Sequence, residues 1–235
     1  MVVGLALASG AVAEPGGLFA GRSGDPSLLP DTSIEAGYIK QDEGNTIGAR
    51  FNYRIDERTM VYGDFGRLEF EDEDSVPPNT SDLETVEASG QGFGLGVFYH
   101  VPELVETLDV SLQASYHRAN LDGSGFVATS EIDQNGQFSV DELEDLESSV
   151  IYAGLFGSSR EPLSENGLFW YLTLGFARVD AEFTLRGAGT ADDDSTDPVY
   201  GGGLVLPLAS GQAYAGYEVL DGEAEYGVGF RYFFE

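Results

Sequence analysis

The sequence contains no cysteine, which excludes disulfide bonds, thiolate metal sites and cysteine nucleophiles. Basic residues are also scarce: 11 lysines and arginines stand against 41 aspartates and glutamates, a formal net charge of −30. Because so acidic a surface repels phosphate backbones, we expect no nucleic-acid partner. Long apolar runs are missing too, and a membrane-spanning helix needs roughly 20 apolar residues. If this chain crosses a membrane, it must therefore do so as a closed β-barrel, in which every backbone group is paired.

Glycine and aromatic residues are abundant in the chain. There are 32 glycines, 12 tyrosines and 15 phenylalanines among 235 residues. Glycine-rich and aromatic-rich composition without a collagen-like period favours turns and strands over helices. The length fits one domain, and the apolar content excludes a disordered chain.

The first residues have the composition of an export signal. Residues 2–13 are apolar and end with small residues at Ala11 and Ala13, the spacing that a signal peptidase reads. We expect a signal peptide over residues 1–13, a periplasmic amino-terminal segment over 14–32, and one β-barrel domain over 33–235.

Apolar and polar residues alternate along much of the remaining chain. The clearest segment is the last, where even-numbered residues from Ala224 to Phe234 are apolar and Glu225 and Arg231 lie on the other face. A two-residue period with one apolar face is typical of strands that span an outer membrane. Similar segments predict an all-β, transmembrane, antiparallel up-and-down barrel of about ten strands, with eight as the alternative. They cover residues 34–38, 46–55, 59–70, 90–101, 108–117, 150–158, 168–176, 199–208, 213–219 and 224–234.

The connections between these segments alternate in length. With the amino terminus in the periplasm, the periplasmic turns (56–58, 102–106, 160–166 and 209–211) are all short. The long, acidic connections (71–89, 122–147 and 186–196) then all lie outside the cell, as outer-membrane barrels require. The strand that begins at Leu168 is expected to leave the membrane near Arg178. Asp221-Gly222 predicts a two-residue hairpin.

Together these features resemble the small outer-membrane β-barrels of Gram-negative bacteria, and the resemblance covers roughly residues 33–234. It implies location in the outer membrane, contact with its lipids and lipopolysaccharide, and insertion by the barrel-assembly machinery. In that family the last strand is the assembly signal, and Gly227, Phe230, Tyr232 and Phe234 match it, although Glu235 follows the final phenylalanine. The resemblance carries no catalytic residue. We expect a non-enzymatic protein and favour a monomer.

Charged residues of both signs are predicted to face the lumen, where they can neutralise one another. Barrels of this size are filled by their own side chains, so a polar, closed lumen with a structural or surface-interaction role is the favoured interpretation. The alternative is a narrow porin-like channel for small solutes or cations. A catalytic arrangement of Ser115, His117 and Asp109 is a weaker alternative to a lumen histidine that only forms hydrogen bonds. The predicted lumen residues are Glu35, Arg50, Arg54, Asp109, His117, Glu218, Glu223, Glu225 and Arg231.

One acidic connection follows the plan of a twelve-residue calcium loop, with oxygen ligands around a central glycine, Gly136. No other cofactor is expected. A solvated acidic loop remains the alternative to calcium binding. The candidate ligands are Glu131, Asp133, Asn135, Gln137, Ser139 and Glu142.

Overall fold

The computed structural model describes residues 31–41, 44–72, 86–124, 126–129, 139–165, 167–186, 189–220 and 222–234. The predicted signal peptide and nearly all of the segment 14–32 lie outside these residues. In the described ranges, no helix is long and apolar enough to cross a membrane. The strands are β1 (Thr32–Lys40), β2 (Gly44–Arg54), β3 (Thr59–Asp72), β4 (Val86–Val105), β5 (Leu108–Ser124), β6 (Phe126–Thr129), β7 (Ser139–Ser159), β8 (Phe169–Leu185), β9 (Gly189–Leu208), β10 (Gly211–Leu220) and β11 (Glu223–Phe233).

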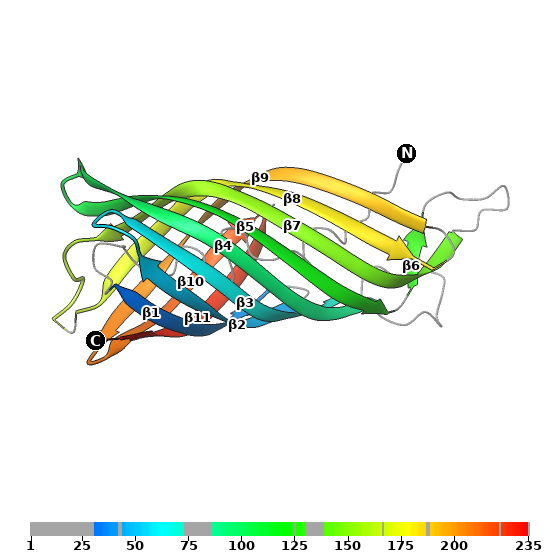
Figure 1. The fold of residues 1–235 in the computed structure, drawn as a ribbon, viewed down its shortest axis with the longest axis horizontal. Helices are drawn as coiled ribbons and strands as arrows, with labels where there is room; N and C mark the ends of the chain where they lie inside the picture. The colour runs from blue at the N-terminus through cyan, green and yellow to red at the C-terminus, as the bar shows by residue number, and fades with distance from the viewer. Residues whose placement is uncertain are drawn as a thin grey trace.

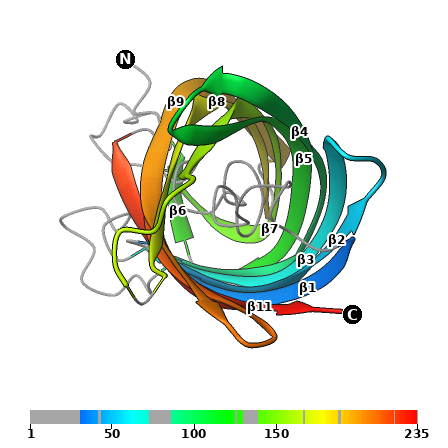
Figure 2. The same ribbon diagram turned by 90° about the vertical axis from the view of Figure 1, so that its left-hand side faces the viewer.

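The strands close into a ring, which Figure 2 shows from one end. Strands adjacent in sequence pair antiparallel, except that β5 pairs with β7 and not with the short β6, and β1 pairs with β11 from Ser33↔Phe233 to Lys40↔Tyr226. The short β6 pairs with the first residues of β7 only, so ten strands form the wall within the described chain. The prediction of a ten-stranded up-and-down barrel is confirmed.

The strands on one side of the barrel are much longer than those on the other side (Figure 1). Strands β4, β7 and β9 have 20, 21 and 20 residues, whereas β1 and β10 have 9 and 10. We call the end where β1 begins and β11 ends the near end, and the opposite end the far end. The long strands project at the far end, past the ends of β10, β11, β1 and β2.

One sequence expectation about the connections was wrong. The long connection expected over 186–196 is mostly the start of β9, and the strand from Leu168 continues past Arg178 as β8 to Leu185. The strands on either side of 71–89 and 122–147 likewise extend into those ranges. The two-residue period continues there with its apolar face reversed: Val179 and Phe183 are buried inside while Glu182 is exposed.

The near end has short connections. Residues 106–107 join β4 to β5 after a register shift between Val101 and Val105, so this turn is tighter than the expected 102–106. In the turn from β2 to β3, Asp56 accepts hydrogen bonds from the backbone N–H groups of Arg58 (2.8 Å) and Thr59 (2.9 Å). These donors lower the pKa of the exposed Asp56 carboxyl, because they stabilise its charged form.

Tyrosines packed on glycines fill much of the interior. The ring of Tyr62 occupies the space beside Gly96: a Cβ added to Gly96 would stand 2.1 Å from Cζ of Tyr62. Tyr214 covers Gly229 in the same way. A bulky inward side chain on one strand is thus matched by a glycine on its neighbour. Side-chain volume is distributed around the ring without forcing the strands apart.

Candidate functional site

A row of directly opposed polar residues crosses the lumen side of four strands. In register, Arg231 of β11 lies opposite Glu35 of β1, Glu35 opposite Arg50 of β2, and Arg50 opposite Asp64 of β3. The four charges alternate in sign along this row. Because each cation has an anion directly across the strand pair, the row stabilises charges that would be costly to bury alone.

Both ion pairs in this charge row are buried and hydrogen-bonded. The Arg50 guanidinium donates from Nε to Oδ1 of Asp64 at 2.6 Å and from Nη2 to Oδ2 at 3.0 Å. The Arg231 guanidinium donates to Oε2 of Glu35 at 2.8 and 3.1 Å, and also to Gln212. All four charged side chains have 0% exposure. The Arg50–Asp64 pair joins two donors to two acceptors, which gives both energy and fixed geometry.

The charge row continues from Asp64 to a histidine two strands away. Asp64 lies opposite Gly94 of β4, and Gly94 lies opposite His117 of β5. His117 Nδ1 lies 3.8 Å from Oδ2 of Asp64, and a Cβ on Gly94 would stand 2.0 Å from that nitrogen. Gly94 therefore leaves the space through which His117 approaches Asp64. Asp109 is not the partner of His117: it lies at the near end, 2.8 Å from Arg160.

The structure brings only some of the predicted lumen residues together. Glu35, Arg50, Arg231 and His117 belong to the row. Glu218 and Glu225 are buried opposite each other on β10 and β11, where Gln41 donates to Glu225 at 2.7 Å. Arg54 lies half-buried at the near end, 3.4 Å from Asp31. The side chain of Glu223 lies outside the described part.

Asp64 is the residue that sequence reasoning missed. It lies in the segment 59–70, where the two-residue period is obscured because Met60 and Tyr62, both large and apolar in part, share the inward face with Asp64. The signal that could have found it is the even-numbered set Met60, Tyr62, Asp64, which continues to Leu68 and Phe70.

Between the charge row and the near end, aromatic rings cross the bore. Tyr62 and Phe98 have ring centroids 5.3 Å apart, Phe98 and Phe156 6.2 Å, and Phe156 and Tyr171 5.6 Å. These residues come from β3, β4, β7 and β8, and each is at most 3% exposed. The chain of rings packs with Met60, Val205 and Tyr214 into one apolar cluster.

The outer surface of the wall has the opposite character. Every wall strand carries large, apolar and exposed side chains on its outward face; Leu95 is 66% and Phe176 64% exposed. Polar residues such as Gln113 are buried inside instead. This inversion of the soluble pattern on a sheet without edges is suited to lipid and not to water. The chain is a transmembrane β-barrel of the outer-membrane type. Its apolar belt comprises Ile34, Tyr38, Ile47, Phe51, Tyr53, Phe65, Phe93, Leu95, Tyr99, Leu112, Tyr116, Ile151, Leu155, Leu172, Leu174, Phe176, Tyr200, Leu204, Leu206, Tyr217, Tyr226, Val228, Phe230 and Tyr232.

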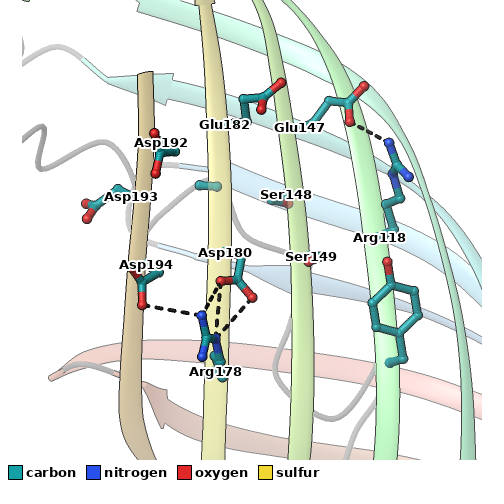
Figure 3. A pocket seen from close by; sticks show the side chains of 12 residues that line it. Arg118, Glu147, Ser148, Ser149, Arg178, Asp180, Glu182, Asp192, Asp193 and Asp194 are labelled. Atoms are coloured by element: carbon teal, nitrogen blue, oxygen red, sulfur yellow. Dashed lines mark hydrogen bonds and ion pairs between the residues drawn. The ribbon is translucent and has the colours of Figure 1, made fainter. Parts of the chain in front are cut away.

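Charged residues replace the apolar belt on the same outward face toward the far end. Tyr116 is followed by Arg118 on β5, and Phe176 by Arg178 on β8. Residues of β5, β7, β8 and β9 there line an open groove of about 420 Å³ (Figure 3). Arg178 lies 3.0 Å from Asp180 and 3.5 Å from Asp194, and Arg118 pairs with Glu147. The groove is also lined by Glu182, Asp192 and Asp193, so its acidic residues outnumber its arginines.

Three of the predicted assembly-signal residues, Phe230, Tyr232 and Phe234, are exposed on the outer face of the barrel or just past its last strand. Gly227 is buried. The proposed calcium ligands Glu131, Asp133, Asn135 and Gln137 lie outside the described residues, and Ser139 is paired with Thr129 at the start of β7. Glu142 accepts a hydrogen bond from Arg186 at 2.6 Å. In the described ranges, no cluster of three or more acidic or histidine residues could hold a metal ion.

No family model and no curated protein matches this chain. Among solved structures, the chain is similar to the KdgM porin, with 12% identity, 86% of this chain and 99% of the porin covered, and a TM-score of 0.38. It is also similar to Ail, the attachment invasion locus protein of Yersinia pestis, in complex with the heparin analogue sucrose octasulfate. The identity is 17%, 87% of this chain and 100% of Ail are covered, and the TM-score is 0.39. A third similar structure is the outer membrane protease OmpT from Escherichia coli. The identity is 11%, 87% of this chain and 97% of OmpT are covered, and the TM-score is 0.49. Identities this low carry neither a ligand nor an activity over to this chain.

Proposed function

We propose that this protein is a non-enzymatic barrel of the Gram-negative outer membrane, with a lumen closed by its own side chains and a structural or surface-interaction role. The observation that carries the proposal is the burial of large side chains inside the barrel. The charge row and the aromatic rings are consecutive layers, and Arg50, Arg231, Phe98, Phe156 and Tyr171 are each at most 1% exposed. A continuous water path is incompatible with such complete burial.

The asymmetry of the two ends supports one orientation. Turns as short as residues 106–107 and 209–210 lie at the near end, and the tall, acidic part of the wall lies at the far end. Outer-membrane barrels have short periplasmic turns and long extracellular extensions. The near end is therefore the periplasmic end, and the acidic far end faces the lipopolysaccharide and the medium.

A catalytic role finds no support in the described residues. His117 has the neighbours of a catalytic base, but its side chain is only 1% exposed and lies within the charge row. A general base must reach the proton that it removes from a substrate. His117 instead has the environment of a structural lumen residue.

Planar bilayer recording tests the closed lumen. The purified protein, inserted from detergent, is expected to give no unitary current steps, whereas an open porin in the same bilayer gives them. Insertion is checked separately by co-flotation with lipid vesicles. Reproducible steps that scale with the amount of inserted protein would overturn the proposal and support the channel for small solutes or cations.

A further inference from the structure

The first half of β9 has a free edge. Residues 189–198 pair with β8, from Gly189↔Leu185 to Pro198↔Phe176. On the other side, the pairing of β9 with β10 begins at Val199↔Leu220 and runs to Leu208↔Gly211. No strand in the described chain pairs with that side of 189–198. At this point β9, still paired with β8, continues past the end of β10, and the strands change from long to short (Figure 1).

Exposure along this segment agrees with an unpaired edge. None of residues 189–198 is buried. In the opposing stretch of β8, every second residue is buried, and Phe183 for example is only 1% exposed. A strand paired on one side presents a row of backbone N–H and C=O groups to which another strand can add. The backbone of 189–198 is thus accessible for pairing from the side where β10 ends.

The side chains on this edge select the charge of the partner. Asp192, Asp193, Asp194 and Asp197 lie within six residues, and the groove beside them adds Asp180 and Glu182. Arg178 pairs with Asp194 and Asp180. Aspartate is disfavoured in strands, and like charges side by side repel. The same carboxylates therefore oppose pairing with a second copy of β9 and favour a cationic strand.

We propose that the 189–198 edge of β9 binds an extended, lysine- or arginine-rich polypeptide segment by strand addition. The incoming strand occupies the place that β10 would hold if it continued past Leu220. Backbone hydrogen bonds to β9 provide the alignment, and its cationic side chains neutralise the aspartates of the edge and groove. The inference rests on the proposed surface role and names the class of its partner.

Binding of a synthetic probe tests the inference. The probe is a fluorescent ten-residue peptide of alternating lysine and valine, titrated by anisotropy into the full-length barrel in nanodiscs of zwitterionic lipid. We expect saturable, salt-sensitive binding and slower amide hydrogen exchange in residues 189–198. The double variant D192N/D194N is expected to weaken binding about three- to tenfold, since each exposed ion pair contributes modestly.

Two controls separate strand addition from attraction to a negative surface. The variant D122N/D145N removes the same charge from exposed residues of β5 and β7 at the far end, but both strands are paired on both sides. The affinity of this variant for the probe is expected to lie within about twofold of the affinity of the unchanged protein. A backbone N-methylated probe with the same charge cannot complete the ladder and is expected to bind at least about tenfold more weakly.

Equal weakening by the two double variants, or undiminished binding of the N-methylated probe, would overturn strand addition. Absence of any binding would overturn it as well. Either failure leaves the bilayer recording unaffected, because that experiment depends on the lumen alone.

Discussion

Replacing Asp64 with alanine is expected to destabilise the barrel by about 3–5 kcal/mol, because it leaves Arg50 charged and without its main anion inside the lumen. Arg50 has 0% side-chain exposure, and Glu35, the carboxylate opposite it on β1, already pairs with Arg231. Its guanidinium also lies 4.0 Å above the ring of Tyr62, so it cannot turn toward water without disturbing the aromatic layer. Urea unfolding of the barrel reconstituted in lipid vesicles measures the loss.

A matched substitution on the same strand provides the control. Glu69 also pairs with an arginine, Arg67 at 3.2 Å, but both side chains are more than half exposed. E69A is expected to change the free energy of unfolding by less than about 1 kcal/mol. The double variant R50M/D64L, which removes both charges, is expected to be more stable than D64A alone. If D64A and E69A had equal effects, the charge row would not be a buried network.

Replacing Gly96 with alanine is expected to cost about 1–3 kcal/mol by overpacking the lumen. The new Cβ would stand 2.1 Å from Cζ and 2.3 Å from the hydroxyl of Tyr62. The tyrosine ring cannot retreat, because Arg50 lies over it, Phe98 packs 5.3 Å away, and its hydroxyl accepts a hydrogen bond from Gln113. Thermal unfolding, followed as the loss of the compact band on unheated gels, ranks the variants.

Gly157 is the control for this substitution. It lies in β7, and a Cβ at this position would have no heavy atom within 4 Å, so G157A is expected to be neutral within about 0.5 kcal/mol. In the background Y62A, the cost of G96A is expected to disappear, because the two residues compete for one space. Equal costs of G96A with and without Tyr62 would show that the glycine serves the backbone and not the packing.

The architecture of the wall could be predicted from the sequence because lipid imposes a two-residue period. In the predicted segment 90–101 the apolar phase contains Phe93, Leu95 and Tyr99, and in the last segment it contains the even-numbered residues from Tyr226 to Phe234; all of these are exposed. The number of wall strands followed from counting such segments.

The far ends of the strands could not be predicted in the same way. Past Phe176, the apolar residues Val179 and Phe183 face inward and Asp180 and Glu182 face outward or toward solvent. A search for apolar residues on the lipid side ends where that side becomes charged. The alternation itself continues to Leu185, so a test for period alone, without its sign, would have found the longer strand.

The charge row was only partly accessible to sequence reasoning. Alternation puts Glu35, Arg50, His117 and Arg231 on the inner face, but it does not say which residues lie opposite one another. That depends on the registers of β11, β1, β2 and β3, which the hairpins and the ring closure set. Gly94 lies in the phase of the segment 90–101 that faces inward, but its role beside His117 appears only once both neighbouring strands are in place.

The central claim is that the apolar belt lies in lipid and the charged face above it lies in water. The absence of native cysteine allows single spin labels to be placed along one outward row of β8, at Leu172, Leu174, Phe176, Arg178, Asp180 and Glu182. In vesicles, we expect molecular oxygen to relax the first three labels and a water-soluble nickel chelate to relax the last three, with the change between Phe176 and Arg178. Access of the chelate to Leu174 equal to its access to Asp180 would contradict the account.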